Sequence, residues 1–171
     1  MITLRHETKN DYPAITRVND LAFGRKAEGN LIKQLRNKNT FVPELSIIAE
    51  YNKQVVGHML FTLVEITNEH KSHQTLTLAP MAVIPEYQKK SIGKLMIVFG
   101  LQEARELGHR SVIVVGHPSY YPKFGFVPAS KWNISSPFPA PEEAFMALEL
   151  QTGSLSGIDG RVVFPPEFDG L

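Results

Sequence analysis

Three strand-like segments follow one another in the middle of the chain with no helix between them, and this order limits the fold more than any other feature. The segments are Leu45–Tyr51, Val55–Ile66 and Thr75–Ile84. The first two are joined by the short polar turn Asn52-Lys53-Gln54, which predicts an antiparallel hairpin. A doubly wound nucleotide-binding fold alternates strands and helices from its start, so that architecture is excluded.

Helices and shorter strands surround this block. Ser91–Leu107 shows the clearest helical pattern, because apolar residues recur on one face and Gly108 follows its end. Ser111–Val115 is almost wholly apolar, which is typical of a buried central strand. The other expected elements are a strand at Ile2–Arg5, helices at Thr8–Phe23 and Ala27–Asn37, a turn at Pro118–Phe124, a strand starting at Phe126, a strand at Phe145–Leu150 and an edge strand at Arg161–Phe164.

The order of these elements predicts a mixed α/β fold. Apolar residues make up 43% of the 171 residues, which is enough to fill a core. No internal repeat or linker interrupts the chain, so we expect a single domain over residues 1–171. Pro80 lies inside the Thr75–Ile84 strand, and because proline has no N–H for a ladder, we expect a bulge or a sheet edge there.

Composition excludes several classes of function. The chain has no cysteine, so disulfides, thiolate nucleophiles and cysteine-ligated metals are excluded. The net charge is +1 without a long basic run, which argues against a nucleic-acid or membrane-surface partner. The segment Met1–Lys9 has no apolar core of the kind that a secretory signal needs, so a cytoplasmic protein is the simplest expectation. The histidines show no metal-ligand spacing, and we expect no metal site.

The most informative segment joins the end of a strand to the start of a helix through the polar turn Gln88–Lys94. The first amides of a helix lack intrahelical acceptors and carry partial positive charge, so this turn is a natural anion site. Lys89, Lys90 and Lys94 add charge, and Gly93 leaves room for a phosphate. Neither a P-loop nor a dinucleotide-binding glycine motif matches these positions.

The run Gln88-Lys89-Lys90-Ser91-Ile92-Gly93 resembles the Gln/Arg-x-x-Gly-x-Gly/Ala loop of the GNAT superfamily of N-acetyltransferases. Ser91 is the departure, since the family usually has glycine there. The resemblance implies acetyl-CoA as the cofactor, with its diphosphate on the loop from Gln88 to Lys94. It also implies that the backbone around Met81, Ala82 and Val83 contacts the acetyl carbonyl and the pantetheine arm.

A second segment, Gly116–Phe126, resembles the Tyr-x-x-x-Gly-Phe segment that closes the same superfamily's site. Tyr121 lies four residues before Gly125, where many members have a general acid that protonates the departing CoA thiolate. Phe124 is expected beside the cofactor. The resemblance extends over nearly the whole chain and is nearest to the YhbS-like branch of predicted acetyltransferases. It implies a mostly antiparallel central sheet of about 6–7 strands, splayed in the middle, with helices on both faces.

The implied reaction is transfer of an acetyl group to a primary amine of a small molecule or a protein, by direct attack in a ternary complex. An amine is protonated at neutral pH, so a base is needed. The candidates are Glu65, His73 and His117, of which Glu65 has the most plausible position. Two other classes stay open: a non-catalytic sensor that binds acyl-CoA, and an interaction domain without a ligand. Either a monomer or a homodimer is expected.

Overall fold

Nine strands and three α-helices, linked by short 3-10 turns, make up this computed structural model, which describes all 171 residues. The strands are β1 Ile2–His6, β2 Phe41–Tyr51, β3 Gln54–Thr67, β4 Ser72–Val83, β5 Ser111–Val115, β6 Val127–Pro128, β7 Ile134–Ser135, β8 Phe145–Glu149 and β9 Gly160–Val163. The helices are α1 Tyr12–Phe23, α2 Ala27–Leu35 and α3 Ile92–Glu106. The 3-10 turns are η1 Lys9–Asp11, η2 Pro85–Tyr87, η3 Tyr121–Phe124, η4 Ala129–Trp132, η5 Glu142–Ala144 and η6 Pro166–Gly170.

The predicted mixed α/β fold is confirmed, with corrections to its details. The sheet has nine strands, whereas the family resemblance implies about six or seven; the two-residue strand β7 is the one that no sequence pattern indicated. The strand expected to begin at Phe126 begins at Val127. The second helix ends at Leu35, two residues before the expected Asn37. Thr8 and Asp11 form a capping box at the start of the η1 turn that leads into α1.

Hydrogen bonds order the strands as β1-β2-β3-β4-β5-β8-β6, and β9 pairs with both β3 and β7. The pairs β4–β5 and β7–β9 are parallel, while β1–β2, β2–β3, β3–β9, β5–β8 and β6–β8 are antiparallel. The β4–β5 ladder joins only Leu76 to Val112 and Thr77 to Ile113. Pro80, which follows a cis peptide bond, lies beyond that ladder. β4 as a whole is not an edge strand, but its β5 side is unpaired beyond Thr77, so the expected edge exists locally at Pro80.

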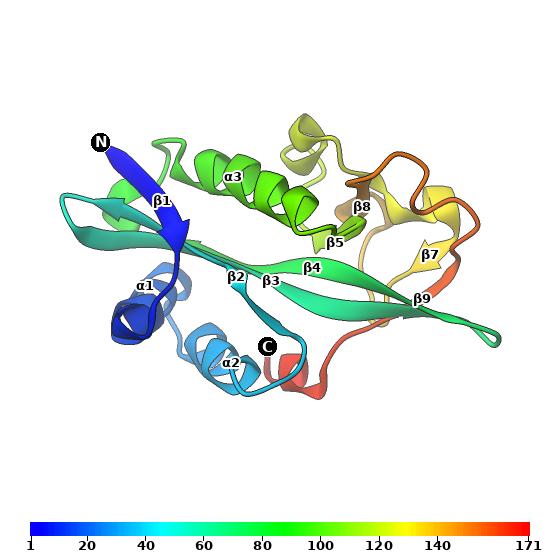
Figure 1. The fold of residues 1–171 in the computed structure, drawn as a ribbon, viewed down its shortest axis with the longest axis horizontal. Coiled ribbons are helices and arrows are strands. Elements are labelled where there is room, and N and C mark those ends of the chain that lie inside the picture. Colours follow the sequence, from blue (N-terminus) through cyan, green and yellow to red (C-terminus); the bar gives the residue numbers. More distant parts are fainter. The chain divides into compact units, whose positions relative to one another are not determined.

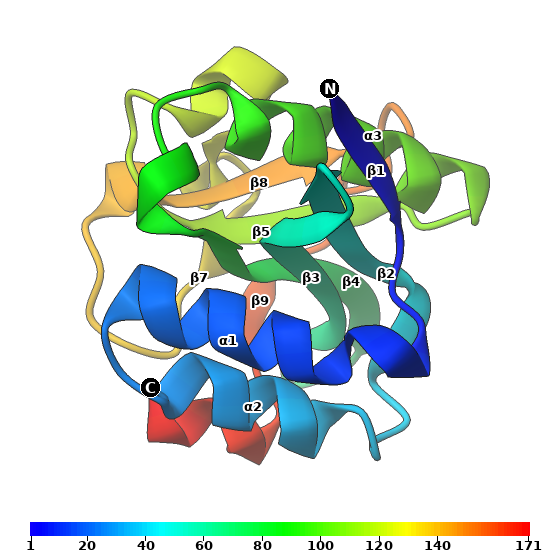
Figure 2. The same ribbon diagram turned by 90° about the vertical axis from the view of Figure 1, so that its left-hand side faces the viewer.

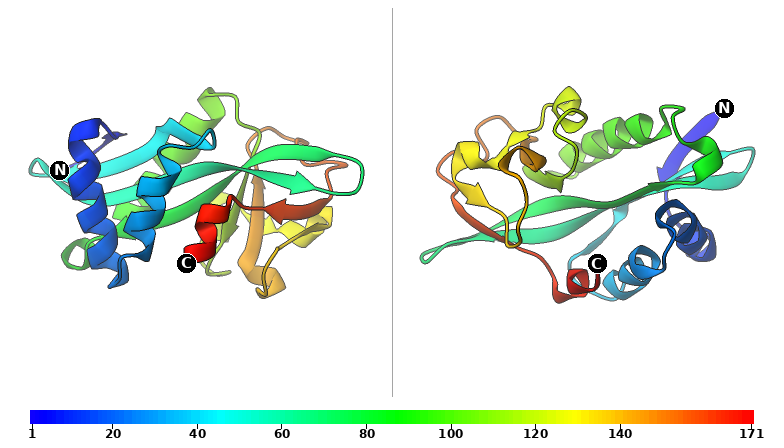
Figure 3. Two further views of the ribbon diagram at one scale, coloured as in Figure 1. Left: turned by 90° about the horizontal axis from the view of Figure 1, so that it is seen from below. Right: turned by 180° about the vertical axis from the view of Figure 1, so that it is seen from behind.

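The chain divides into two compact units. The first consists of Met1–Thr62, Ala79–Glu103 and Pro166–Leu171, and the second of Leu63–Leu78 and Ala104–Pro165. In the first unit, α1 and α2 cover one face of the sheet and α3 covers the other, as expected (Figure 1). Figure 2 shows α1 and α2 side by side, and Figure 3 shows the same pair from below.

The core of the first unit forms where the apolar faces of the helices meet the sheet. Ile15 and Val18 of α1, which lie on one face of the helix, are fully buried. On the other face, Gly100 of α3 allows a close approach to the sheet. A Cβ added there would lie 2.4 Å from Cε of Met59 and 2.6 Å from Cε2 of Phe61. No helix in the structure combines the length and the apolar character that crossing a lipid bilayer requires.

The second unit has its own core around β5 and β8. These strands pair in register from Ser111 opposite Glu149 to Val115 opposite Phe145. The expected burial of β5 is confirmed over its first four residues, while Val115 is exposed. The buried cluster of this unit consists of Val64, Ile66, Ile113, Ala129, Ile134, Phe145, Ala147, Leu155 and Val162.

Candidate functional site

The predicted anion-binding turn has an unusual backbone. Lys89 has φ of 62° and Ser91 has φ of 66°, so both lie in the left-handed region. This conformation costs a residue with a side chain roughly 1–2 kcal/mol, while glycine adopts it freely. The left-handed φ at Ser91 explains in physical terms why glycine is favoured at this position of the loop. Ser91 adopts that conformation despite its Cβ.

The start of α3 leaves amide groups free for an anion. Leu95 is the first residue whose N–H is held within the helix, by a bond of 3.0 Å to the carbonyl of Ser91. The N–H groups of Ile92, Gly93 and Lys94 therefore lie outside the helical ladder. The helix dipole adds partial positive charge at this end. With the preceding residues exposed, the turn can accept a diphosphate from solvent.

Three contacts hold this turn in place. The Gln88 side chain donates from Nε2 to the carbonyl of Val83 over 2.9 Å, which ties the loop to the end of β4. The Tyr87 ring packs against Tyr51, with 5.6 Å between centroids. Lys90 Nζ lies 5.6 Å from the centroid of the Tyr87 ring. Gln88 therefore acts on the loop's shape through its side chain, a role that the sequence did not indicate.

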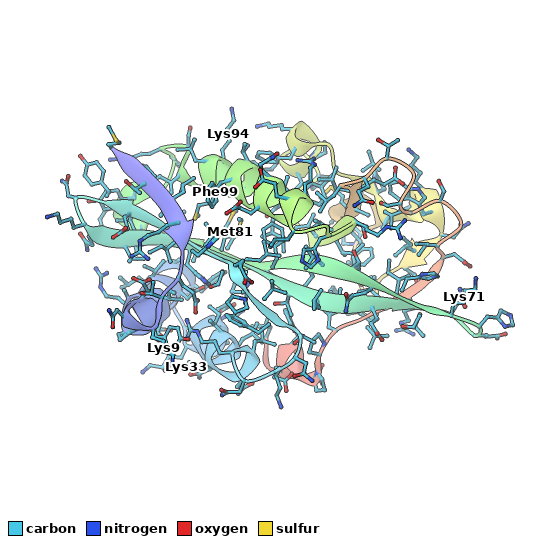
Figure 4. The ribbon with its side chains drawn as sticks, viewed as in Figure 1. Lys9, Lys33, Lys71, Met81, Lys94 and Phe99 are labelled. Carbon is cyan, nitrogen blue, oxygen red and sulfur yellow. The ribbon has the colours of Figure 1, made fainter.

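Lysines supply the charge around the turn. Lys89, Lys90 and Lys94 are exposed, and none of them forms an ion pair with an acidic residue. Figure 4 shows Lys94 on the side of α3 that faces away from the sheet. These charges raise the local concentration of anions without fixing their position. An anion bound at this turn would be positioned by the amides, and the lysines would add to the strength of binding.

The end of β4 alternates between buried and half-buried side chains. Ala82 is buried, so only its backbone is available to a ligand. Met81 and Val83 are half-buried, and because side chains alternate along a strand, both lie on the opposite face from Ala82. A ligand that runs along β4 therefore meets the side chains of Met81 and Val83.

Tyr121 lies in the second unit, in the turn after β5. Its ring packs edge-on against Tyr120 and Phe126, with centroids 5.2 Å and 5.7 Å away. Gly116 makes room for it, because a Cβ on Gly116 would lie only 2.2 Å from Cε2 of Tyr121. The side chain is only 9% exposed. Burial, with a smaller effect of Tyr120, raises the pKa of Tyr121 to about 12.

This raised pKa keeps the Tyr121 phenol protonated throughout the physiological range, so the group is available as a donor. The neighbouring Phe124 is half-buried and packs against Tyr120 at 5.4 Å between centroids. Gly125 ends the turn with φ of 98°, a conformation that favours glycine. The aromatic packing and the turn together fix the position of Tyr121 within the second unit.

The three candidate bases lie in different surroundings. Glu65 is exposed on β3, opposite Val163 of β9. His117 is also exposed, and its backbone carbonyl accepts from the N–H of Tyr121 over 3.3 Å. His73 is half-buried near the start of β4, beside a cavity at the other end of β5 from the Tyr121 turn.

The structure also contains a buried polar network that the sequence did not indicate. His58 of β3 is fully buried between Asn19 Nδ2, 3.2 Å from its Nδ1, and Ser46 Oγ, 3.0 Å from its Nε2. Ser46 donates to the Glu7 carboxylate, which also pairs with Arg36 at 3.1 Å. Burial, reinforced by the charge of Arg36, lowers the pKa of His58 to about 3.

The hydrogen bonds of this network determine the tautomer of His58. Asn19 Nδ2 also donates to the carbonyl of Ile15 over 3.0 Å, so this atom is the amide nitrogen and donates to His58 Nδ1. Nε2 of His58 therefore carries the proton and donates to Ser46, whose hydroxyl proton goes to Glu7. In a protonated ring Nδ1 would also carry a proton, and this N–H would face the NH₂ donor of Asn19. The conflict between two donors explains why the neutral form is favoured.

Sequence comparisons with known proteins show which family this chain resembles. A family model described as "Acetyltransferase (GNAT) domain" matches residues 3–129. The chain is 38% identical to the uncharacterized N-acetyltransferase YjhQ of Escherichia coli over 148 residues, covering 83% of this chain and 82% of YjhQ. It is 28% identical to the uncharacterized N-acetyltransferase YhbS of the same organism over 97% of this chain and 98% of YhbS.

Solved structures show the same likeness. The crystal structure of E. coli YhbS in complex with CoA superposes with a TM-score of 0.90 at 27% identity, covering 98% of this chain and 92% of that chain. A GNAT family acetyltransferase from Brucella melitensis in complex with acetyl-CoA gives a TM-score of 0.79 at 27% identity, covering 99% of each chain. The match of the family model over most of the sequence, together with the identity to YjhQ, shows that this chain belongs to the GNAT family of acetyltransferases.

Proposed function

We propose that this protein transfers an acetyl group from acetyl-CoA to a primary amine of a small-molecule or protein acceptor, by direct attack in a ternary complex. The observation that carries the proposal is the left-handed turn before α3, which frees the amides of Ile92, Gly93 and Lys94 for an anion. The complexes of similar proteins with CoA and acetyl-CoA support the same cofactor here. Because the likeness runs from end to end, we treat residues 1–171 as one acetyltransferase domain.

In this proposal, the turn from Gln88 to Lys94 holds the diphosphate of the cofactor. The free amides donate to its oxygens, and Lys89 and Lys90 add charge. The pantetheine arm then runs along the half-buried face of β4 at Met81 and Val83, with the backbone of Ala82 between them. A backbone N–H aimed at the thioester carbonyl stabilises the negative charge that develops there during attack.

The reaction needs a base before attack and an acid after it. The acceptor amine loses a proton to Glu65 through water, and its nitrogen forms a bond to the thioester carbon. When the tetrahedral intermediate collapses, the carbon–sulfur bond breaks and the sulfur leaves with the electron pair. The protonated Tyr121 hydroxyl donates to this sulfur. The proposal requires the Tyr121 hydroxyl to reach the sulfur of a cofactor that the turn holds.

A Tyr121→Phe variant tests the proposal, because it keeps the ring that packs on Tyr120 and Phe126 and removes only the hydroxyl. We expect kcat to fall about 10²–10⁴-fold while the affinity for acetyl-CoA is kept. Tyr120→Phe is the matched control, and its kcat should stay close to that of the wild type. Calorimetry measures cofactor affinity, and release of free CoA thiol in the presence of a panel of amines measures turnover.

The outcomes separate the classes of function. Cofactor binding without turnover of any amine by the wild type would favour the acyl-CoA sensor. Absence of acetyl-CoA binding would reject both the transferase and the sensor. A Glu65→Gln variant tests the base separately. If its kcat matches that of the wild type across the pH range, Glu65 is not the base, and His117 becomes the next candidate.

A further inference from the structure

A cavity of about 260 Å³ lies in the second unit, away from the residues used in the proposed reaction. Residues from the start of β4, from the turn between α3 and β5, and from the loop after β8 line it. It opens beside Ser111, the first residue of β5, whereas Tyr121 follows the last residue of that strand. Four residue steps of an extended strand span about 13 Å, so the cavity and Tyr121 lie at opposite ends of β5.

The side chains that line this cavity suit an anion. His73, His109 and Arg110 are among them, and no aspartate or glutamate is. None of these three side chains takes part in an ion pair or a side-chain hydrogen bond, so their donors are free. The nearby carboxylate of Glu149 does not line the cavity and accepts from the N–H of Leu155 over 2.8 Å.

Arg110 supplies the permanent charge of the cavity, since a guanidinium stays protonated in proteins. Burial lowers the pKa of His109, so this ring is neutral at neutral pH and offers one N–H donor. The backbone of Arg110 is fixed, because its carbonyl accepts from Ser154 Oγ over 2.7 Å and from the N–H of Leu150 over 2.8 Å. The cation therefore projects from a rigid turn.

Two buried hydroxyls add a further donor. Thr75 Oγ1 and Ser111 Oγ lie 2.6 Å apart and bond to each other. A pair of hydroxyls has two protons, and their mutual bond uses only one of them. The second proton has no acceptor within the pair and is available to a ligand in the cavity. The remaining wall is partly apolar, with Ile66, Leu155 and Ile158.

We infer that this cavity binds a small oxyanion, a carboxylate or a phosphate, through Arg110, the two histidines and the Thr75–Ser111 hydroxyl pair. The apolar wall favours a ligand with a short hydrocarbon part, and the volume limits it to a small molecule. The site lies outside the proposed acetyl-transfer reaction, and its occupant does not need to react. Because the hydroxyl pair directly precedes the β4–β5 ladder, an anion bound there also stabilises the pairing of these strands.

Calorimetric titration of the full chain with inorganic phosphate and with butyrate tests the inference. We expect at least one of these probes to bind. The Arg110→Gln variant should lower the affinity for that probe about tenfold or more. A tighter site for butyrate than for phosphate identifies the ligand as a carboxylate with an apolar part, and the reverse identifies a phosphate. His109→Phe, which removes the ring nitrogens but keeps an aromatic ring, should also lower the affinity for that probe.

Two controls locate the binding. Arg105→Gln makes the same charge change on an exposed residue that does not line the cavity, and it should leave the affinity unchanged. Lys9→Gln, on an exposed residue of the first unit, should also leave it unchanged. The absence of heat with both probes, or an equal loss of affinity in a control variant and in Arg110→Gln, overturns the inference. Acetyl-CoA binding is measured separately, so failure of this site leaves the proposed function standing.

Discussion

The buried imidazole of His58 should make the fold sensitive to acid. In the folded protein its pKa lies near 3, against 6.5 for an ordinary histidine. The folded state therefore favours the neutral ring, while the unfolded chain takes up a proton as the pH falls below about 6.5. The stability that the neutral ring contributes is complete above the unfolded pKa and is lost as the pH falls from 6.5 towards 3.

The size of this loss follows from the two pKa values. The difference between 6.5 and about 3 sets a ceiling of about 5 kcal/mol at low pH. At pH 5 the unfolded histidine is almost fully protonated and the folded one is not, so the loss relative to pH 7.5 is about 2 kcal/mol. The full burial of His58 means that solvent screening does not reduce this effect.

A His58→Gln variant isolates the effect. The Gln side chain offers a carbonyl oxygen to Asn19 and an amide nitrogen to Ser46, so both hydrogen bonds have a replacement without a titratable ring. Urea unfolding followed by far-ultraviolet circular dichroism at pH 7.5 and at pH 5 gives the free energy of unfolding of each protein. We expect the wild type to lose about 2 kcal/mol more than the variant between these pH values.

In the comparison of the wild type with His58→Gln, the contributions of other acid-sensitive groups cancel. Arg5, with the Thr8 amide and hydroxyl, lowers the pKa of Asp11, so this carboxylate also makes the fold less stable in acid. Since Asp11 is present in both proteins, its contribution cancels. Equal losses in the wild type and in His58→Gln would refute the argument. An NMR chemical shift of the His58 ring carbons that is typical of a protonated imidazole, measured in the folded protein at pH 5, would refute the argument independently.

Three further changes test the packing. Gly116→Ala should lower the free energy of unfolding by about 1–3 kcal/mol, because its Cβ forces the Tyr121 ring to move; urea unfolding measures the loss, and a crystal structure with an unmoved ring would contradict it. Ser91→Gly should raise the free energy of unfolding by up to about 1 kcal/mol, because it relieves a left-handed φ; a loss would contradict this. Arg36→Met should lower the free energy of unfolding by about 3–5 kcal/mol, because the Glu7 carboxylate is left charged and buried. A thermal unfolding temperature equal to that of the wild type would contradict this.

Local patterns predicted much of this fold. The helix α3 and the hairpin of β2 and β3 were identified because their apolar periodicity and turn residues are local signals. The same holds for the turn at Gln88–Lys94, whose capacity for anions depends on its place between a strand and a helix. The two-residue strand β7 could not be predicted, because it exists only through its partner β9.

The sequence by itself determined the order of the helices and of all strands except β7, and the positions of the polar turn before α3 and of the turn that contains Tyr121. Only the tertiary structure decided that His58 is buried and neutral, since Asn19 and Ser46 come from distant parts of the chain. It also brought His73, from the start of β4, to the cavity beside Arg110. The physical reason is that burial and hydrogen-bond partners determine the chemistry of a polar side chain, and neither can be read from its neighbours in sequence.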